Sequence, residues 1–566
     1  MSAEDDFFVR LGRIGDRGPA SGLGRGFVGE VLGAAKRGGQ GTLGTGGRTE
    51  RRRLGRGGLK RAGATGGRRV VIKARIVRHS GARFRAAPLA KHMRYLQREG
   101  VTRDGQPASM FDRDGPADPE RFAERSADDR HHFRFIVSPE DADRLEDLQA
   151  FTRDLMAQAE RDLDTPLDWV AVDHWNTDNP HIHVLVRGRT ADGADLVMDR
   201  EYMMSGFRRA AERLVGLELG PRTEQEIDAG LDREVMAERW TSLDRRLWSL
   251  REGDGCVDLR PAQDDGGDAR LKGRAAHLQR LGLAQDHGGR WRLSEELEPQ
   301  LRALSRRGDI IKTMHAAMRG EPRDPAQLVL HPGAPEQPVL GRLVDRGLDD
   351  ELNGSAYVIV DGVDGRLHHF RFGDLDQVGD TRLGGVVEVR AWSREGEGAR
   401  ADLLHRSDLS LDRQVNARGA TWLDRRLVAI DPQPVAGAFG REVREALEAR
   451  RDHLATLGLI DENGRPVSNL IGRLRREDLE RTGAALSRET GRAHRPTVAG
   501  AAVEGVYRRR LDLASGRFAM IDDGLGFQLV PWTRGLERYR EEPVKGVMTP
   551  GGGIDWALGR KRGISL

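Results

Sequence analysis

The sequence predicts a multidomain α+β protein in which an antiparallel-sheet domain precedes smaller accessory domains. The chain has 566 residues, which corresponds to several domains at about 100–200 residues each. Short β-branched runs alternate with amphipathic helical segments over residues 69–225. A sharp change in composition separates that region from residues 1–68, so the first domain is expected to begin at residue 69.

Residues 1–68 are predicted to be a disordered, basic tail. Over residues 1–70, Lys and Arg number 15 and Asp and Glu number 6, and 20 of the 72 glycines of the chain lie there. Few large apolar residues are present to offset the entropy lost on ordering a chain of this composition. The tail is either a solvated linker or an element that attracts nucleic acid without sequence preference.

Residues 69–225 are predicted to form a mainly antiparallel sheet with helices on one face, in the order β-α-β-α-β-β-α. Strands are expected where β-branched and aromatic residues cluster, and helices where apolar residues recur at three- and four-residue spacing. The predicted strands are 70–77, 132–137, 169–172 and 182–186, and the predicted helices are 88–100, 138–163 and 203–216. Ser138 is the expected N-cap of the second helix because a carboxylate follows three residues later.

The remaining residues are predicted to form three accessory domains. Residues 226–320 should contain a helical connector and a winged-helix-like domain, because a helix is followed by a Gly288-Gly289 turn and another helix. Residues 335–410 read as a small β domain and residues 420–566 as a mixed α/β domain. Leu281-Gly282-Leu283 is echoed by Leu457-Gly458-Leu459, which suggests a second copy of one unit.

Composition excludes several classes of protein. The single cysteine, Cys256, excludes an intramolecular disulfide and zinc modules built from several thiolates. No apolar stretch is long enough for a membrane span, so no membrane insertion is expected. The acidic start of the chain does not resemble a secretion signal. No GxxxxGK[ST] loop is present, which argues against a fused helicase.

The segment from Asp173 to Val184 carries the residues most typical of a metal site. His181 and His183 are two apart on a predicted strand, so their side chains share one face. His174 ends the preceding strand, and a short turn rich in Asn, Asp and Pro would bring it beside that pair. Three converging imidazoles are typical of a divalent-cation site with open coordination positions.

A second pattern lies on the helix predicted over residues 88–100. Lys91, Arg94, Tyr95 and Arg98 fall on one face, away from the apolar stripe. Such a cationic face attracts a phosphodiester backbone, and the positive charge favours the phenolate form of the tyrosine. A tyrosine activated in this way can attack a metal-bound phosphate to form a covalent phosphotyrosine.

With these residues in view, residues 69–225 resemble the HUH endonucleases. Tyr95-Leu96-x-Arg98-x-Gly100 resembles the nucleophile motif of the plasmid relaxases, or mobilization nucleases, of the VirD/MobA type. The C-terminal motifs at residues 515–520 and 527–532 are similar to the extension of one relaxase subgroup. The resemblance implies that Tyr95 is the nucleophile and that His174, His181 and His183 bind Mg²⁺ or Mn²⁺.

The acid that assists the tyrosine is assigned less directly. Asp173 and Asp178 are both near the histidines in sequence. Alternation along the strand puts Asp173 on the face opposite His174, whereas Asp178 lies in the turn and can reach either ring. Asp178 is therefore the preferred candidate.

The resemblance implies a relaxase that nicks single-stranded DNA at the transfer origin of a plasmid or integrative element, forms a 5′-phosphotyrosine, and then rejoins the strand. It also implies accessory origin-binding proteins and a type IV secretion coupling protein as partners, and a cytoplasmic protein that is translocated with DNA into a recipient cell. Two alternatives stay open: a replication initiator or transposase of the same HUH class, and a non-catalytic DNA-binding regulator.

Overall fold

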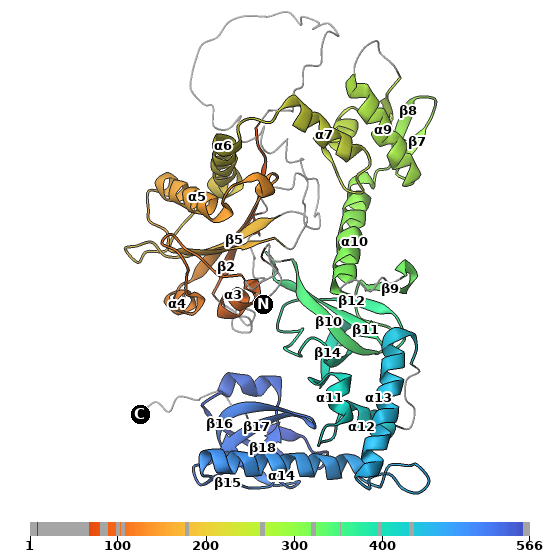
Figure 1. Ribbon diagram of the computed structural model, residues 1–566. Helices are drawn as coiled ribbons and strands as arrows, with labels where there is room; N and C mark the ends of the chain where they lie inside the picture. Colours follow the sequence, from red (N-terminus) through yellow and green to blue (C-terminus); the bar gives the residue numbers. More distant parts are fainter. Residues whose placement is uncertain are drawn as a thin grey trace, which may run out of the picture. The chain divides into compact units, whose positions relative to one another are not determined.

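The computed structural model divides the chain into two compact units, residues 1–307 and 308–566 (Figure 1). It describes residues 8–9, 67–79, 89–97, 102, 108–175, 180–260, 266–318, 324–350, 352–393, 398–429 and 435–557. No helix within these described residues is both long enough and apolar enough to cross a membrane. The predicted multidomain α+β architecture is confirmed at this level, since helices and several sheets occur in both units.

The first unit is built around a five-stranded antiparallel sheet in the order β1-β2-β3-β5-β4. The strands and helices predicted over residues 69–225 are present in the predicted order, with one additional short helix (Pro119–Arg125) before the second predicted strand. The strands are β1 (Phe8–Val9), β2 (Val70–Arg78), β3 (His131–Pro139), β4 (Trp169–His174) and β5 (His181–Arg187).

Helices cover both faces of this sheet, which corrects the prediction of helices on one face only. Helices α5 (Leu148–Leu163) and α6 (Phe207–Leu219) pack on the face that forms the main core. Helices α3 (Leu89–Leu96) and α4 (Pro119–Arg125) pack on the other face. The second apolar face arises because the side chains of Val170, Val172 and Leu185 point away from the main core, so β4 and β5 are buried on both sides.

Helix α5 starts later than predicted. Ser138 still lies in the ladder of β3, opposite Val71 of β2, and its hydroxyl donates to the Pro180 carbonyl. A 3₁₀ turn (Ala142–Arg144) follows, and Asp147 is the N-cap of α5, because its carboxylate accepts from the first backbone N–H groups of that helix. The prediction that Ser138 is the N-cap of this helix was therefore wrong, because Ser138 pairs with the neighbouring strand instead.

Most of the predicted tail lies outside the described residues. Within it, β1 pairs with β2, and Arg68 is buried. The Arg68 guanidinium lies 3.2 Å from the Asp141 carboxylate and 3.4 Å from that of Glu226. These ion pairs connect Arg68, which lies just before β2, to Asp141 and to Glu226 at the end of the sheet domain.

The rest of the first unit consists of helices packed on a small sheet of order β6-β8-β7. The predicted Gly turn between two strands is present, and Gly288 and Gly289 both have positive φ, which favours glycine. The elements are α7 (Glu224–Val235), α8 (Ser242–Ser249), β6 (Cys256–Asp258), α9 (Gly266–Arg280), β7 (Ala284–Asp286), β8 (Arg290–Leu293) and α10 (Leu297–Ala317), the last of which continues into the second unit.

The second unit holds two six-stranded sheets with the same topology. In each, three further strands extend a central hairpin into a group of five antiparallel strands, and one short edge strand pairs in parallel with the strand at one end of that group. The first sheet comprises β9 (Leu328–His331), β10 (Val339–Asp350), β11 (Ser355–Gly362), β12 (Leu367–Phe372), β13 (Val386–Trp392) and β14 (Arg400–Ser407). The second comprises β15 (Ala493–His494), β16 (Ala502–Leu513), β17 (Gly516–Asp522), β18 (Gly526–Pro531), β19 (Pro543–Met548) and β20 (Ile554–Trp556).

The helices that precede the two sheets carry the same buried ion pair. Arg274 of α9 binds Asp244 of α8, and Arg450 of α13 (Gly437–Thr456) binds Asp424 of α12 (Trp422–Leu427), with every one of these side chains fully buried. Helices α11 (Leu411–Val415) and α14 (Leu470–Thr490) complete the second set. Matching helices and matching sheets show that the chain contains an internal duplication, as the Leu-Gly-Leu echo suggested.

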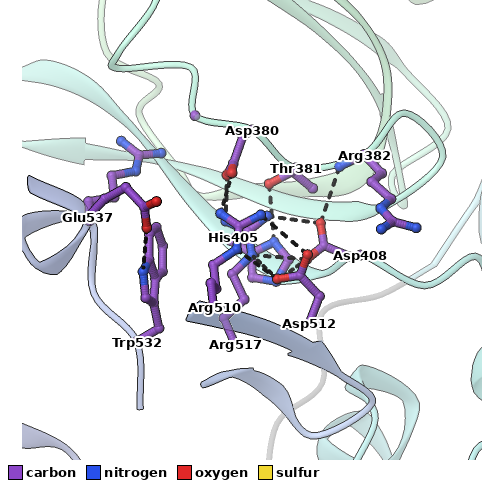
Figure 2. Close-up of polar contacts among 12 residues, drawn as sticks. Asp380, Thr381, Arg382, His405, Asp408, Arg510, Asp512, Arg517, Trp532 and Glu537 are labelled. Carbon is purple, nitrogen blue, oxygen red and sulfur yellow. Dashed lines mark hydrogen bonds and ion pairs between the residues drawn. The ribbon is translucent and has the colours of Figure 1, made fainter. Parts of the chain in front are cut away.

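A partly buried ionic cluster joins the two sheets of the second unit (Figure 2). Arg517 of β17 lies 2.9 Å from the carboxylate of Asp408 and 2.7 Å from that of Asp380. Arg510 of β16 also pairs with Asp380, and His405 of β14 lies 3.4 Å from Asp408. Arg510 and Arg517 belong to the second sheet, whereas Asp380 and Asp408 lie beside strands of the first sheet. The ion pairs between them therefore hold these two sheets together.

Candidate metal centre

The β4–β5 hairpin brings the three predicted histidines together. His174 is the direct cross-strand partner of His181, and His183 lies two residues further along β5 on the same face. The ring centroids are 5.4 Å apart for His174 and His181, 4.6 Å for His174 and His183, and 5.0 Å for His181 and His183. The geometry expected from the sequence is therefore present.

The three imidazoles form a closely spaced, buried set of nitrogen donors. Their exposed fractions are 0% for His174, 8% for His181 and 3% for His183. One ring nitrogen from each lies within 4.8 Å of those of the other two. Ligands bound at about 2.0–2.1 Å to one ion lie at most about 4 Å apart, so small ring rotations bring the three into a coordination sphere. The residues present thus fit a divalent metal ion.

A backbone carbonyl orients one of these rings. His174 Nε2 lies 2.7 Å from the carbonyl oxygen of Leu96, the last residue of α3. Because a carbonyl only accepts, Nε2 carries the proton and Nδ1 retains the lone pair that a metal requires. A ligand histidine held through its second nitrogen is the usual arrangement in protein metal sites.

The same contact places the end of α3 at the histidine cluster. Tyr95 immediately precedes Leu96 and is half-buried against the core that α3 shares with β4 and β5. The apolar stripe predicted for this helix is buried, with Met93 and Leu96 fully inaccessible. The sequence pattern predicted the buried stripe of this helix, but it did not predict that the helix packs on the histidine face of the sheet.

The other predicted site residues are placed less completely. Arg94 is exposed on α3. The side chain of Lys91, together with Arg98 and Asp178, lies outside the described residues, so the predicted cationic face and the preferred acid stay predictions.

Asp173 lies on the face opposite the histidines, as strand alternation predicted. Its carboxylate accepts from Trp175 Nε1 at 2.6 Å and from the side-chain amide of Gln149, on α5, at 3.1 Å. Its partners come from the side of the sheet covered by α5, so Asp173 is positioned to hold the hairpin and not to accept a proton from Tyr95.

A polar group on the histidine face was not recognised from the sequence. His132 is fully buried; its Nδ1 lies 2.7 Å from His79 Nε2, and its Nε2 accepts from Arg134 Nε at 2.9 Å. Burial and the positive charge of Arg134 hold the pKa of His132 well below its ordinary value, so the ring is neutral. The available signal was the alternation of His132 and Arg134 along β3, directly opposite Val77 and Arg75 of β2.

Comparison with known proteins identifies the C-terminal half of the chain. The profile of a family described as "Protein of unknown function (DUF3363)" matches residues 271–402 and 393–565. These segments make up more than half of the chain, which therefore belongs to the DUF3363 family. No curated protein and no solved structure matches the sequence. The family match begins beyond the histidine cluster, so the function of that site is argued from its geometry.

Proposed function

We propose that this protein is a metal-dependent DNA strand transferase of the HUH relaxase class. The observation that carries the proposal is the hydrogen bond between His174 and the Leu96 carbonyl, which joins the end of the tyrosine helix to the histidine cluster. A tyrosine beside a three-histidine metal site supplies the two elements needed for transesterification of a phosphodiester.

The histidines and the tyrosine have distinct roles in this reaction. A divalent cation, Mg²⁺ or Mn²⁺, held by His174, His181 and His183 would stabilise negative charge on a non-bridging phosphate oxygen. The Tyr95 hydroxyl oxygen attacks the phosphorus, forming a Tyr–O–P bond while the P–O3′ bond breaks. The 3′ oxygen leaves and takes a proton to become a free hydroxyl. Attack by that hydroxyl on the phosphotyrosine reverses the step without a nucleotide cofactor.

The accessory regions are assigned to DNA and partner binding within this proposal. The helices and three-stranded sheet over residues 226–320 fit a winged-helix-like DNA contact, and single-stranded DNA at a transfer origin is the proposed substrate. Origin-binding proteins and a secretion coupling protein are the proposed partners of the duplicated C-terminal half, in a protein that acts in the cytoplasm and travels with DNA.

The test is formation of a covalent adduct by the full-length chain. Purified protein is incubated with single-stranded oligonucleotides that tile the transfer origin of its replicon, in Mn²⁺ or in EDTA, and then denatured. We expect a metal-dependent protein–DNA adduct that is absent in Tyr95→Phe. Tyr202→Phe is the matched control, because Tyr202 lies in the same domain, in the π-turn (Tyr202–Gly206) before α6, where its hydroxyl donates to Asp162.

Three results distinguish the possible functions. An adduct that survives in Tyr95→Phe but disappears in Tyr202→Phe would mean that the other tyrosine is the nucleophile. Tight DNA binding without any adduct over the whole tiled origin would favour the non-catalytic regulator. Repeated rounds of cleavage by one protein molecule would favour a replication initiator or transposase, because a single tyrosine supports one nick and one rejoining.

A further inference from the structure

The histidine face of the five-stranded sheet also carries a group of cations next to the metal centre. Ile136 of β3 lies directly opposite His183, and Arg134 is two residues away on the same face. Arg75 of β2 lies directly opposite Arg134. This register places two positively charged side chains side by side on the histidine face of the sheet.

Arg134 is held by a neutral group instead of an acid. Its Nε donates to the neutral imidazole of His132 at 2.9 Å. Within the described part of the chain, Arg134 forms no ion pair. By contrast, Arg274 and Arg450, which are fully buried whereas Arg134 is partly exposed, are each paired with an aspartate.

The electrostatic consequence is an arginine whose charge is poorly compensated. Burial, followed by the charge of Arg75, lowers the pKa of Arg134 to about 9. At neutral pH the guanidinium is still charged. With its Nε fixed by His132, the two terminal amino groups remain as paired donors, which is the geometry that binds phosphate in a bidentate manner.

We propose that Arg134, with Arg75 opposite it, binds a phosphodiester of single-stranded DNA next to the phosphate that reacts at the histidine cluster. This inference rests on the proposed strand-transferase function and names a substrate contact of the same site. Diagonal neighbours across two strands lie about 7–8 Å apart, which is the scale of the separation between successive phosphates in an extended strand. Arg134 is therefore assigned as a substrate-binding residue that sets the register of the DNA.

The experiment measures DNA binding and thermal stability of the full-length protein and of Arg134→Met. The probe is a fluorescent oligothymidylate in EDTA, titrated at several salt concentrations. Loss of a charged hydrogen bond to phosphate should weaken binding about tenfold or more. The slope of log K against log salt should fall by about 0.7 for each phosphate of the single strand that the variant no longer neutralises.

Thermal unfolding separates a binding role from a structural one. Because no acid is left unpaired, Arg134→Met should unfold at the same temperature as the wild type or higher. Arg134→Lys should keep most of the salt dependence, since it keeps the charge. Arg161→Met is the matched control, because Arg161 is exposed on α5, on the opposite face of the sheet, and should change neither binding nor its salt slope.

The outcomes distinguish this inference from the proposed function. If wild-type protein forms the Tyr95 adduct but Arg134→Met binds DNA with an unchanged affinity and salt slope, the inference is wrong and the strand-transferase proposal stands. Weaker binding with a smaller slope, in a protein that forms no adduct at all, supports the phosphate contact and rejects the transferase. A lower unfolding temperature with an unchanged slope would make Arg134 structural. Stabilisation by inorganic phosphate that needs Arg134, with unaltered DNA binding, would assign a free anion instead and overturn the inference.

Discussion

Replacement of Arg450 by methionine should be among the most destabilising single changes in the C-terminal half. The Arg450 guanidinium donates through Nε and Nη2 to the Asp424 carboxylate at 2.8 and 2.9 Å. It also donates to the carbonyls of Val415, Ala417 and Gly419 at 2.9, 2.8 and 3.1 Å. All five hydrogen bonds are made by one fully buried side chain, and a methionine side chain can form none of them.

The magnitude follows from what the substitution leaves behind. Removing one partner of a buried ion pair costs about 3–5 kcal/mol, because the other charge stays buried without compensation. Thr421 continues to donate to Asp424 through its backbone N–H and its hydroxyl, at 2.7 and 2.8 Å, and this limits the loss. We therefore expect the free energy of unfolding of this helical set to fall by about 3–5 kcal/mol.

The assay is amide hydrogen exchange in α13 as urea is increased, because exchange reports the local stability of this helix within a chain of several domains. Arg274→Met provides a matched measurement on α9, where the same five bonds occur at 2.6 to 3.1 Å. The double variant Arg450→Met/Asp424→Leu should recover much of the loss, because an apolar pair leaves no buried charge. A loss below about 1 kcal/mol, the range of exposed ion pairs, or a double variant less stable than the single one would refute this reasoning.

Two further predictions concern the second unit. Burial, and then the charge of Arg517, lower the pKa of His405 from 6.5 to about 4, so the neutral ring contributes stability that is full above pH 6.5 and is lost as the pH falls towards 4. In His405→Gln, the urea concentration at the midpoint of unfolding should depend less on pH over this range. A pH dependence equal to that of the wild type would contradict the lowered pKa of His405. Gly341→Ala should cost about 1–3 kcal/mol by thermal melting, because a Cβ there overlaps the Asp361 carbonyl oxygen. Gly308→Ala, in open space on α10, is its control and should be neutral or stabilising.

Local patterns predicted the convergence of the three histidines well because its geometry depends on one hairpin. Strand alternation places His181 and His183 on one face, and the short connection brings His174 opposite His181. The contact between His174 and the Leu96 carbonyl could not be predicted, because it joins residues 78 positions apart in the chain. The uncompensated Arg134 was missed for a similar reason, since its significance depends on which strand β3 pairs with.

The fold was predicted correctly where periodicity was clear and incorrectly where tertiary contacts decide. Ser138 had a good capping pattern, yet pairing with β2 kept it in the sheet. Helices on the second face of the sheet were missed because the apolar residues of β4 and β5 were assigned to a single core. The duplication was visible in one tripeptide echo, whereas the recurrence of Thr241-x-Leu-Asp-Arg-Arg-Leu as Thr421-x-Leu-Asp-Arg-Arg-Leu was overlooked. Its meaning becomes clear from the shared Asp–Arg pairs.

The matching sheets create a hazard during folding. In each copy, a long helix leads into the short parallel strand that closes one edge of its sheet, β9 beside β12 and β15 beside β18. A chain with two such edges can exchange them, giving a swapped form in which every strand is still hydrogen-bonded. The edge strands differ in length, four residues in β9 and two in β15. After an exchange, β15 would be too short for its place beside β12, and β9 would be too long for its place beside β18. We expect this difference in strand length to favour the correct pairing over the swapped one.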